Sequence, residues 1–390
     1  MYQTKAVNMR KYDVCLAMPG IPIRFPAGGT NIILQLAKGL KETGLNVCLV
    51  YVPDTEKVVQ EKTGEKINLQ SYALAQDFLK LIRGPKFLKF VRYVWNLFHR
   101  LKYDYSKIQE IDESIVFSTR NMKIRCEKIV ACDWWTPYLV DSYNADSAAM
   151  KYRLTLAMED IVERRGKDAN LAAISYSFNA IKIVSDINLF RRFREEGPKF
   201  ILLGIDHSIY KLDNPINGRS KVVLFPLRNR PGNGIDYLLT AISKLNDICP
   251  QIKFVGFGNL RPVLVPNFID YYYKPANELL KKLYNESSVF VMPSTLDDFA
   301  LPVLEAMACG SAVITTNNGG IYYIKNNYNG ILVPPKDSEA IVNAVMRLLV
   351  DENFRISVAE RGKKTSQAFT YEQMVSSFLK ALQTTQENRL

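Results

Sequence analysis

Short apolar runs recur along the chain and alternate with longer segments whose apolar residues follow a helical period. The short runs predict buried strands, and the longer segments predict amphipathic helices. In the first half, we expect a helix from Thr30 to Thr43, closed by Gly44, and strands at residues 12–20, 46–53, 128–132, 152–158, 170–175 and 200–206. Regular alternation of this kind is typical of a parallel α/β sheet.

The alternation begins again after a polar stretch at 211–221, which contains Pro215 and Gly218 and is typical of a linker. Strands are predicted at 221–227, 252–258, 288–294, 311–316 and 330–335, and helices at 234–245, 276–285, 301–309 and 338–350. Two such runs predict an α/β protein with two Rossmann-like parallel-sheet domains that face each other across a cleft. Ligands of such sheets bind at the carboxyl ends of the strands.

Length and composition agree with two globular domains. The chain has 390 residues, of which 47% are hydrophobic and 23% charged, so it can bury large cores and is not a low-complexity chain. We expect an N-terminal domain at residues 1–210, a C-terminal domain at 211–352 and a helical tail at 353–390 that could return to the first domain.

The net charge of +12 predicts affinity for anions, and nucleic acid, anionic lipid headgroups and nucleotide diphosphates all remain open. No apolar run approaches the roughly 18 to 20 residues of a membrane span, and the short N-terminal apolar stretch has no small-residue cleavage site. We therefore expect a cytoplasmic protein. The six cysteines form no CxxC pair and only two histidines are present, which argues for ordinary thiols and against a zinc or multi-histidine metal centre.

Two predicted strand ends carry residues suited to phosphate. Gly28 and Gly29, followed by Thr30, lie between the first strand and the first helix, where backbone N–H groups and a helix N-terminus favour an anion. A tight turn explains the glycine pair equally well. Arg228 and Arg230 follow a strand of the second half and would neutralise a diphosphate, unless they are solvated surface arginines.

A pair of acids accompanies a predicted helix start in the second half. Asp297 and Glu305 flank a segment in which Pro302 favours the first helical turn. Glu305 would then lie one turn into the helix, with the N–H groups near Ala300 and Leu301 at its positive end. A carboxylate there suits paired ribose hydroxyls and the amides suit sugar hydroxyls or phosphate, although Glu305 could be an ordinary acid near a helix start.

The sequence DDFALPVLEAMACGSAVITTNNGG closely resembles the E-x7-E segment and following GG turn of retaining GT-B glycosyltransferases, notably glycosyltransferase family 4. The resemblance covers nearly all of the second domain and scattered points of the first, including Gly28-Gly29, the Ser175 region, 202–211, Arg228, 255–261 and 327–337. It implies the GT-B fold, with the acceptor on the N-terminal domain and the nucleotide sugar on the C-terminal domain.

The resemblance also implies roles for individual residues. Glu305 matches the glutamate that binds the donor ribose, and the donor diphosphate would be bound by Gly28, Gly29, Thr30, Arg228 and Asn233. The donor sugar would be held by Asp297, Phe299, Ala300 and Leu301, and the catalytic residues would be Arg228, Arg230 and Asp297. Family members transfer a sugar from a nucleotide diphosphate sugar to a glycan or lipid-linked acceptor, with retention of configuration and without a cofactor or an obligatory metal.

Several positions depart from the family pattern. The first glutamate is Asp297, the glycines that usually flank the phenylalanine are Asp298 and Ala300, and the lysine five residues after Arg228 is Asn233. Loss of that lysine charge costs about 3 kcal/mol of transition-state stabilisation unless Arg230 replaces it. A histidine of the N-terminal domain is here Cys132. A non-catalytic nucleotide-sugar-binding or partner-stabilising homologue, or a sugar-nucleotide epimerase, therefore stays open.

A basic amphipathic segment lies between Lys80 and Lys102. As a helix it places Lys86, Lys89 and Arg92 on one face and Trp95 with other aromatic residues on the opposite face. This pattern suits the surface of an anionic membrane, although an ordinary helix packed on the core explains it too. No nucleic-acid-binding fold accompanies it, so we expect a lipid-linked acceptor rather than a nucleic acid.

Overall fold

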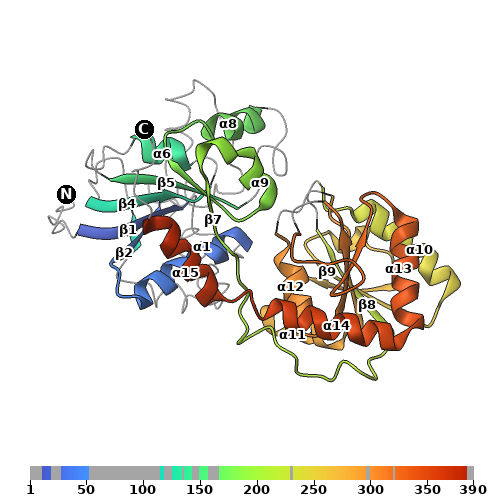
Figure 1. The fold of residues 1–390 in the computed structure, drawn as a ribbon. Helices are drawn as coiled ribbons and strands as arrows, with labels where there is room; N and C mark the ends of the chain where they lie inside the picture. Colours follow the sequence, from blue (N-terminus) through green and yellow to red (C-terminus); the bar gives the residue numbers. More distant parts are fainter. Residues whose placement is uncertain are drawn as a thin grey trace, which may run out of the picture.

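The computed structural model describes residues 11–18, 28–51, 115–117, 125–133, 136–142, 149–156, 167–228, 232–295, 299–318 and 321–383. These residues form two separate sheets, each with helices packed against it (Figure 1). Every pair of neighbouring strands within these sheets is parallel.

The first sheet is formed by the first half of the chain. In spatial order, its strands are β3 (Ile115–Phe117), β2 (Val47–Tyr51), β1 (Lys11–Met18), β4 (Arg125–Ala131), β5 (Met150–Thr155), β6 (Ile181–Val184) and β7 (Lys199–Phe200). The described helices are α1 (Gly28–Glu42), α6 (Thr136–Ser142), α8 (Lys167–Ser175) and α9 (Ile187–Arg192). The central strands β1 and β4 end in apolar runs at 14–17 and 129–131 because both faces of the sheet are covered there, as the fully buried Leu16 and Val130 illustrate.

The second sheet follows the same plan. Its strands, in spatial order, are β10 (Ile269–Tyr273), β9 (Lys253–Gly258), β8 (Val222–Leu227), β11 (Val289–Met292), β12 (Ala312–Thr316) and β13 (Ile331–Val333). Its helices are α10 (Ile235–Ile248), α11 (Asn277–Glu286), α12 (Leu301–Ala308) and α13 (Ser338–Val350). In both sheets, the strand order reverses beside the first strand, which is where doubly wound folds open a crevice for ligands. The predicted pair of Rossmann-like sheets is confirmed.

Two strand predictions in the first half are wrong, and two strands of this half, β3 and β6, were not predicted. Residues 170–175 belong to helix α8, because a short apolar run fits a buried helix face as well as a strand. The strand predicted at 200–206 is reduced to β7, and the chain beyond it leaves the sheet. Strand β3 has only three residues, and β6 reads Ile-Lys-Ile-Val, with Lys182 buried against Glu196.

The two helices of the tail pack against different halves of the molecule. Helix α14 (Glu352–Ser366) packs on α12, whereas α15 (Tyr371–Gln383) packs on α1 beside the first sheet (Figure 1). The contact is close, because a Cβ on Gly39 would lie 2.2 Å from a methyl group of Val375. The hydroxyl of Tyr152 also donates to the carbonyl of Leu382 at 3.0 Å.

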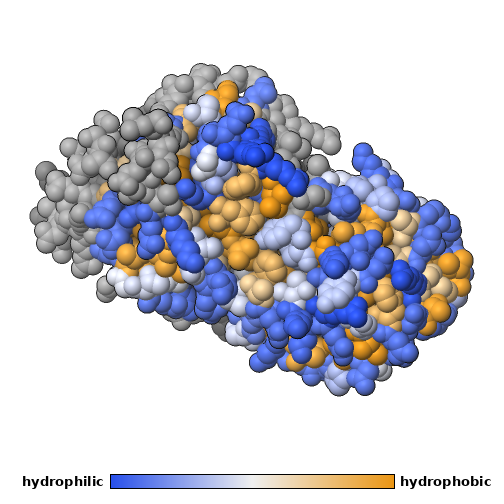
Figure 2. All heavy atoms as spheres, viewed as in Figure 1, coloured by the Kyte–Doolittle hydropathy of each residue, from blue (hydrophilic) through white to orange (hydrophobic). Residues whose placement is uncertain are grey.

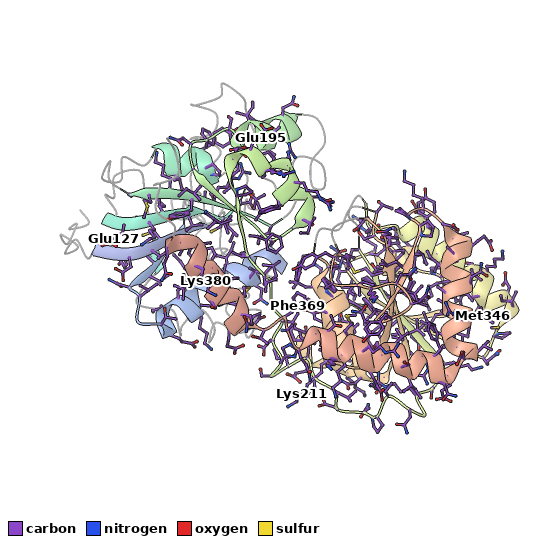
Figure 3. All side chains as sticks on the ribbon, viewed as in Figure 1. Glu127, Glu195, Lys211, Met346, Phe369 and Lys380 are labelled. Carbon is purple, nitrogen blue, oxygen red and sulfur yellow. The ribbon has the colours of Figure 1, made fainter. Side chains whose placement is uncertain are left out.

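Two chain segments therefore cross side by side between the halves. The N–H of Ile205 donates to the carbonyl of Phe369 at 3.0 Å, and a Cβ on Gly204 would lie 2.2 Å from the carbonyl oxygen of Thr370. Figure 3 places Phe369 at this crossing and Lys380 on the helix over the first sheet. The ring nitrogen Nε2 of His207 lies 3.1 Å from the carbonyl of Ser366, so this histidine also joins the two segments.

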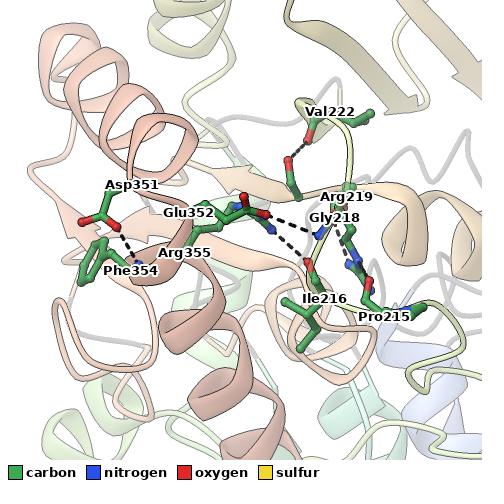
Figure 4. A network of polar contacts seen from close by, with 11 residues as sticks. Pro215, Ile216, Gly218, Arg219, Val222, Asp351, Glu352, Phe354 and Arg355 are labelled. Carbon is green, nitrogen blue, oxygen red and sulfur yellow. Dashed lines mark hydrogen bonds and ion pairs between the residues drawn. The ribbon is translucent and has the colours of Figure 1, made fainter.

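The segment predicted as a linker is fixed to the second half. The guanidinium group of Arg219 donates to the main-chain carbonyls of Asn214, Pro215, Tyr284, Ser287 and Cys309. Arg355 of α14 donates to the carbonyl of Ile216 at 3.2 Å and pairs with Glu352 at 2.8 Å (Figure 4). An arginine that donates to many carbonyls holds a polar stretch in a single conformation.

The surface agrees with an ordinary globular exterior. In Figure 2, hydrophilic side chains cover most of the visible half that contains the second sheet, with hydrophobic residues scattered among them. None of the helices in the described part of the chain is both long and apolar enough to cross a membrane.

Candidate functional site

Three loops meet at the carboxyl end of the second sheet, after β8, β11 and β12. The carbonyl of Gly232 accepts hydrogen bonds from the N–H of Thr295 at 2.7 Å, from its Oγ1 at 3.1 Å and from Oγ of Ser294 at 3.0 Å. The carbonyl of Ser294 accepts from Oγ1 of Thr316 and from Nδ2 of Asn318. The loops are thus joined into one unit that would need little reorganisation on binding.

A glycine makes this junction possible. Gly234 precedes α10 with φ of 68°, and a Cβ at this position would lie 1.9 Å from the carbonyl oxygen of Pro293. Both the left-handed backbone and the close approach exclude a larger residue. The loop after β8 therefore lies against the loop after β11.

The loop after β8 carries Arg228 and Asn233. Arg228 is the first residue beyond the strand and is partly exposed. The side-chain amide of Asn233 donates to the carbonyl of Arg228, and its Oδ1 accepts the N–H of Ile235 at 3.1 Å. Asn233 thus closes the turn and satisfies an N–H at the start of α10, and its predicted contact with a diphosphate stays a prediction.

The loop before α12 presents backbone groups at a helix N-terminus. Ala300, the N-cap residue, has φ of 54°, and its side chain makes no capping hydrogen bond. The hydroxyl of Tyr323 donates to the carbonyls of Phe299 at 2.9 Å and of Ala300 at 3.1 Å, which fixes the loop from the strand β12 side. The N–H of Leu301 therefore lies at the positive end of the helix, where a hydroxyl or phosphate oxygen is favoured.

Glu305 lies one turn into α12, as the sequence predicts. Its Oε2 accepts a hydrogen bond from the hydroxyl of Tyr284 at 3.0 Å. Burial raises the pKa of Glu305 from 4.5 to about 7, while the bond from Tyr284 and the charge of Arg228 act in the opposite direction. Part of the residue is nevertheless exposed to solvent.

The glycine turn of the first half forms the beginning of α1. Gly28, Gly29 and Thr30 are its first three residues, and the first turn of this 15-residue helix carries no acid. A Cβ on Gly29 would make only ordinary contact with Leu156 at 3.7 Å. The turn is the positive end of a helix at the carboxyl edge of β1, a position that favours an anion.

The structure brings one group of the predicted site residues together. Arg228, Phe299, Ala300, Leu301 and Glu305 lie at one end of the second sheet, and the charge of Arg228 acts on Glu305. Arg230 and Asp297 lie outside the described residues, as do the membrane-contact candidates Lys86, Lys89, Arg92 and Trp95. Their predicted roles stay predictions.

The sequence pattern does not identify two tyrosines as residues of the site. Tyr284 on α11 and Tyr323 after the GG turn are buried residues whose hydroxyls bond to Glu305 and to the loop before α12. Each falls on a position that the apolar pattern assigns to the core. The hydroxyl partners come from elements distant in sequence, so the pattern alone could not identify them.

The cysteines are free thiols, three of which gather in the first sheet. Cys15, Cys48 and Cys126 lie on neighbouring strands and pack in one buried cluster. Cys132 follows β4 directly, donates to the carbonyl of Val130 at 3.5 Å and has a pKa raised by burial. Among the described residues, no group of three or more histidines, cysteines or acids is arranged to hold a metal ion.

Sequence comparisons identify the second half. Residues 207–365 match the family model for glycosyl transferases group 1. An uncharacterized glycosyltransferase of Methanocaldococcus jannaschii is 34% identical over 154 residues, which cover 37% of this chain and 40% of the relative. N,N′-diacetylbacillosaminyl-diphospho-undecaprenol α-1,3-N-acetylgalactosaminyltransferase of Campylobacter jejuni is 25% identical over 136 residues, 35% of this chain and 33% of the relative. The matched segment thus spans well under half of these relatives.

Solved structures share the whole architecture. Sucrose-phosphate synthase from Thermosynechococcus elongatus superposes with a TM-score of 0.66 at 17% identity, over 95% of this chain and 98% of that one. HepE of Anabaena, in complex with UDP and glucose, superposes with a TM-score of 0.65 at 15% identity, over 96% and 100%. At these identities the likeness concerns the fold, which is the predicted GT-B fold.

Proposed function

We propose that this chain, which belongs to the glycosyl transferases group 1 family through residues 207–365, transfers a hexosyl group from a nucleotide diphosphate sugar with retention of configuration. The acceptor in this proposal is a glycan or a lipid-linked sugar. The observation that carries the proposal is Glu305, a partly exposed residue whose desolvated carboxyl group is held by Tyr284 beside the N-terminus of α12.

In the proposed donor site, three protein groups bind three different parts of the nucleotide sugar. Glu305 would accept hydrogen bonds from the paired ribose hydroxyls, because a carboxylate offers two acceptor oxygens. Arg228 would neutralise the diphosphate from the loop after β8. The backbone N–H of Leu301 would bind sugar hydroxyls, with Asp297 and the neighbouring Phe299 and Ala300 completing this part of the site.

The proposed chemistry relies on charge compensation rather than on a protein base. As the bond between the sugar and the diphosphate breaks, the leaving phosphate would accept the proton of the attacking acceptor hydroxyl on the same face. Arg228 and Arg230 would stabilise the negative charge that develops, and the positive ends of α1 and α12 would add to it. This arrangement requires no cofactor, and the departing group itself supplies the base.

A lipid-linked acceptor at the inner face of a membrane is the finer part of the proposal. The basic segment with Lys86, Lys89, Arg92 and Trp95 supports it, as does the net charge of +12. The name of the Campylobacter relative contains a diphospho-undecaprenol group, which is a lipid-linked acceptor of that protein. We expect charge reversal at Lys86, Lys89 and Arg92 to abolish sedimentation with anionic liposomes, and unchanged sedimentation would remove the membrane from the proposal.

The donor site is tested by thermal denaturation with UDP, GDP, ADP and their common sugars, beside the variant Glu305→Ala. One nucleotide class should stabilise the wild type, by about 2.7 kcal/mol at a hundredfold excess over Kd, and the variant should lose this effect. Release of the nucleotide diphosphate should then depend on an added acceptor. Stabilisation without turnover would favour a non-catalytic homologue, which would agree with Asn233 in place of the lysine of the family pattern. Turnover without an acceptor would favour an epimerase.

A further inference from the structure

Tyr284 is a fully buried tyrosine in the core between α11 and the second sheet. Its ring packs edge to face against Tyr210, Phe257 and Phe290, with centroid separations of 5.9, 5.9 and 5.5 Å. Its exposed fraction is 0%. A ring held on several sides by other rings has one orientation, so the direction of its hydroxyl is fixed by packing.

The backbone of Tyr284 is fixed as well. Its carbonyl accepts hydrogen bonds from Oγ of Ser287 at 3.0 Å, from Oγ of Ser311 at 2.9 Å and from Nη1 of Arg219 at 3.5 Å. Arg219 in turn attaches this point to the segment that follows the crossing between the halves. Ring and backbone are therefore positioned independently of any ligand.

The hydroxyl of Tyr284 makes a hydrogen bond that a phenylalanine at this position could not make. A buried hydroxyl costs free energy unless it is hydrogen-bonded, whereas a phenylalanine would fill the same space among these rings. The hydroxyl donates to Oε2 of Glu305 at 3.0 Å. Oε1 of the same carboxyl group then remains for a ligand, and rotation of the carboxylate is restricted.

We propose that Tyr284 is a positioning residue, which orients the carboxylate of Glu305 so that its remaining acceptor sites meet the paired hydroxyls of a nucleotide ribose. The inference rests on the proposed function, because it assumes that Glu305 binds a ribose. It assigns to Tyr284 a role in recognising ribose hydroxyls without contact with the ligand itself.

The same hydrogen bond favours the charged carboxylate, which is the stronger acceptor for ribose hydroxyls. With a pKa of about 7 for Glu305 in the free protein, nucleotide affinity should rise as the pH rises through this value. Titratable groups from several elements surround Glu305: Tyr284, Arg228, Tyr210, Tyr371 and Cys309. Burial and the charge of Glu305 raise the pKa of Tyr210, Tyr371 and Cys309, so these three groups stay uncharged. The other two, Tyr284 and Arg228, lower the pKa of the carboxyl group.

The test is calorimetric titration of the full chain with UDP, GDP and ADP and with their 2′,3′-dideoxy forms, between about pH 5.5 and 8.5. The wild type should bind the ribonucleotide about tenfold or more tightly than the dideoxy form at high pH. In Tyr284→Phe this ratio should fall close to one, the affinity for the dideoxy form should stay unchanged, and the midpoint of the pH dependence should move upward.

Tyr210→Phe is the matched control, because it removes a hydroxyl from the same ring cluster, and it should keep both the ratio and the midpoint. In a Glu305→Gln background, Tyr284→Phe should no longer change the pH dependence, which separates positioning from a general loss of packing. A wild-type ratio retained in Tyr284→Phe would overturn this inference alone. Equal wild-type affinity for both forms, or no nucleotide binding, would overturn the ribose role of Glu305 and the inference with it.

Discussion

The side-chain amide of Asn233 donates to the main-chain carbonyl of Arg228, so the loop that carries the arginine is closed by the residue that replaces a lysine of the family pattern. Oδ1 of the same side chain accepts the N–H of Ile235 at the start of α10. The substitution therefore exchanges a positive charge for a local structural role. The two functions can be separated by mutation.

We expect Asn233→Lys to raise turnover and to lower stability. A lysine here would add a charge near the proposed position of the diphosphate, where a preorganised charge is worth up to about 3 kcal/mol in the transition state, roughly a hundredfold in rate. Loss of the bond to Ile235 should cost about 1 kcal/mol of unfolding free energy. Steady-state release of the nucleotide diphosphate and urea denaturation measure the two effects.

Asn233→Ala is the control, since it removes the same hydrogen bonds without adding a charge. It should lose the same stability and gain no turnover. If Asn233→Lys leaves kcat at the wild-type value while its fold is intact, Arg230 already supplies the charge or the loop does not face the diphosphate.

Glu305 makes the stability of the ligand-free protein depend on pH. Its pKa is raised in the folded protein from 4.5 to about 7, chiefly by burial. Folding therefore takes up a proton between these values, and the free energy of unfolding contributed by this group falls as the pH rises from about 4.5 to about 7. Glu305→Gln keeps an acceptor for Tyr284 but cannot ionise.

The variant Glu305→Gln should thus gain stability relative to the wild type on going from about pH 5 to pH 8. Urea denaturation of both proteins at the two pH values measures the difference. Parallel stability curves over this range would show that the carboxyl group has an ordinary pKa in the folded protein, and that its desolvation is relieved by water.

Ala300 occupies a backbone conformation that favours glycine. Its φ of 54° lies in the left-handed region, where a Cβ costs roughly 1 kcal/mol. The family pattern has a glycine at this place, so the strain accompanies the departure from that pattern. We expect Ala300→Gly to leave the fold unchanged and to raise the free energy of unfolding by up to about 1 kcal/mol, the gain being reduced by the greater freedom of glycine in the unfolded chain.

Thermal denaturation of Ala300→Gly beside Ala306→Gly tests this expectation. Ala306 is buried within the regular part of α12, so glycine there should destabilise by about 1 kcal/mol or more. Destabilisation of similar size in both variants would mean that Ala300 is not strained.

The sequence predicted five of the six strands of the second sheet because these strands are apolar runs and the helices between them are amphipathic, as in residues 222–227 and 338–350. It missed β10, which reads Ile-Asp-Tyr-Tyr-Tyr and is only partly buried. The prediction failed where a polar residue is buried, so that burial does not follow the apolar pattern. Strand β6 contains Lys182, a buried lysine that pairs with Glu196 and lies 5.2 Å from the ring centre of Phe193. An alternating Ile-Lys-Ile-Val run gives no sign that its polar residue faces inward.

The candidate site was predictable only where spacing along the chain carries the information. Glu305 follows Pro302 at a helical interval, so its place one turn into α12 could be inferred. The bond from Tyr284 joins residues 21 positions apart on different helices. Such a contact depends on how α11 and α12 pack, which no local pattern encodes.

Gly234 should be the position in the second half where a single methyl group is most damaging to the site. A Cβ there would lie 1.9 Å from the carbonyl oxygen of Pro293, and φ is 68°. Gly234→Ala must therefore push the loop after β8 away from the loop after β11. This movement would break the hydrogen bonds that the carbonyl of Gly232 accepts. We expect a loss of more than about 2 kcal/mol of unfolding free energy and a large loss of nucleotide affinity.

Gly218→Ala is the control, because it places a Cβ on a left-handed backbone without a steric clash. Gly218 has a φ of 71°, and a Cβ added to it would have no neighbour within 4 Å, so alanine there should cost only about 1 kcal/mol. Because Gly218 precedes β8, whereas the site lies at the carboxyl end of that strand, nucleotide affinity should be unchanged. Equal effects of the two variants in denaturation and in nucleotide titration would show that the contact between the two loops does not hold the site together.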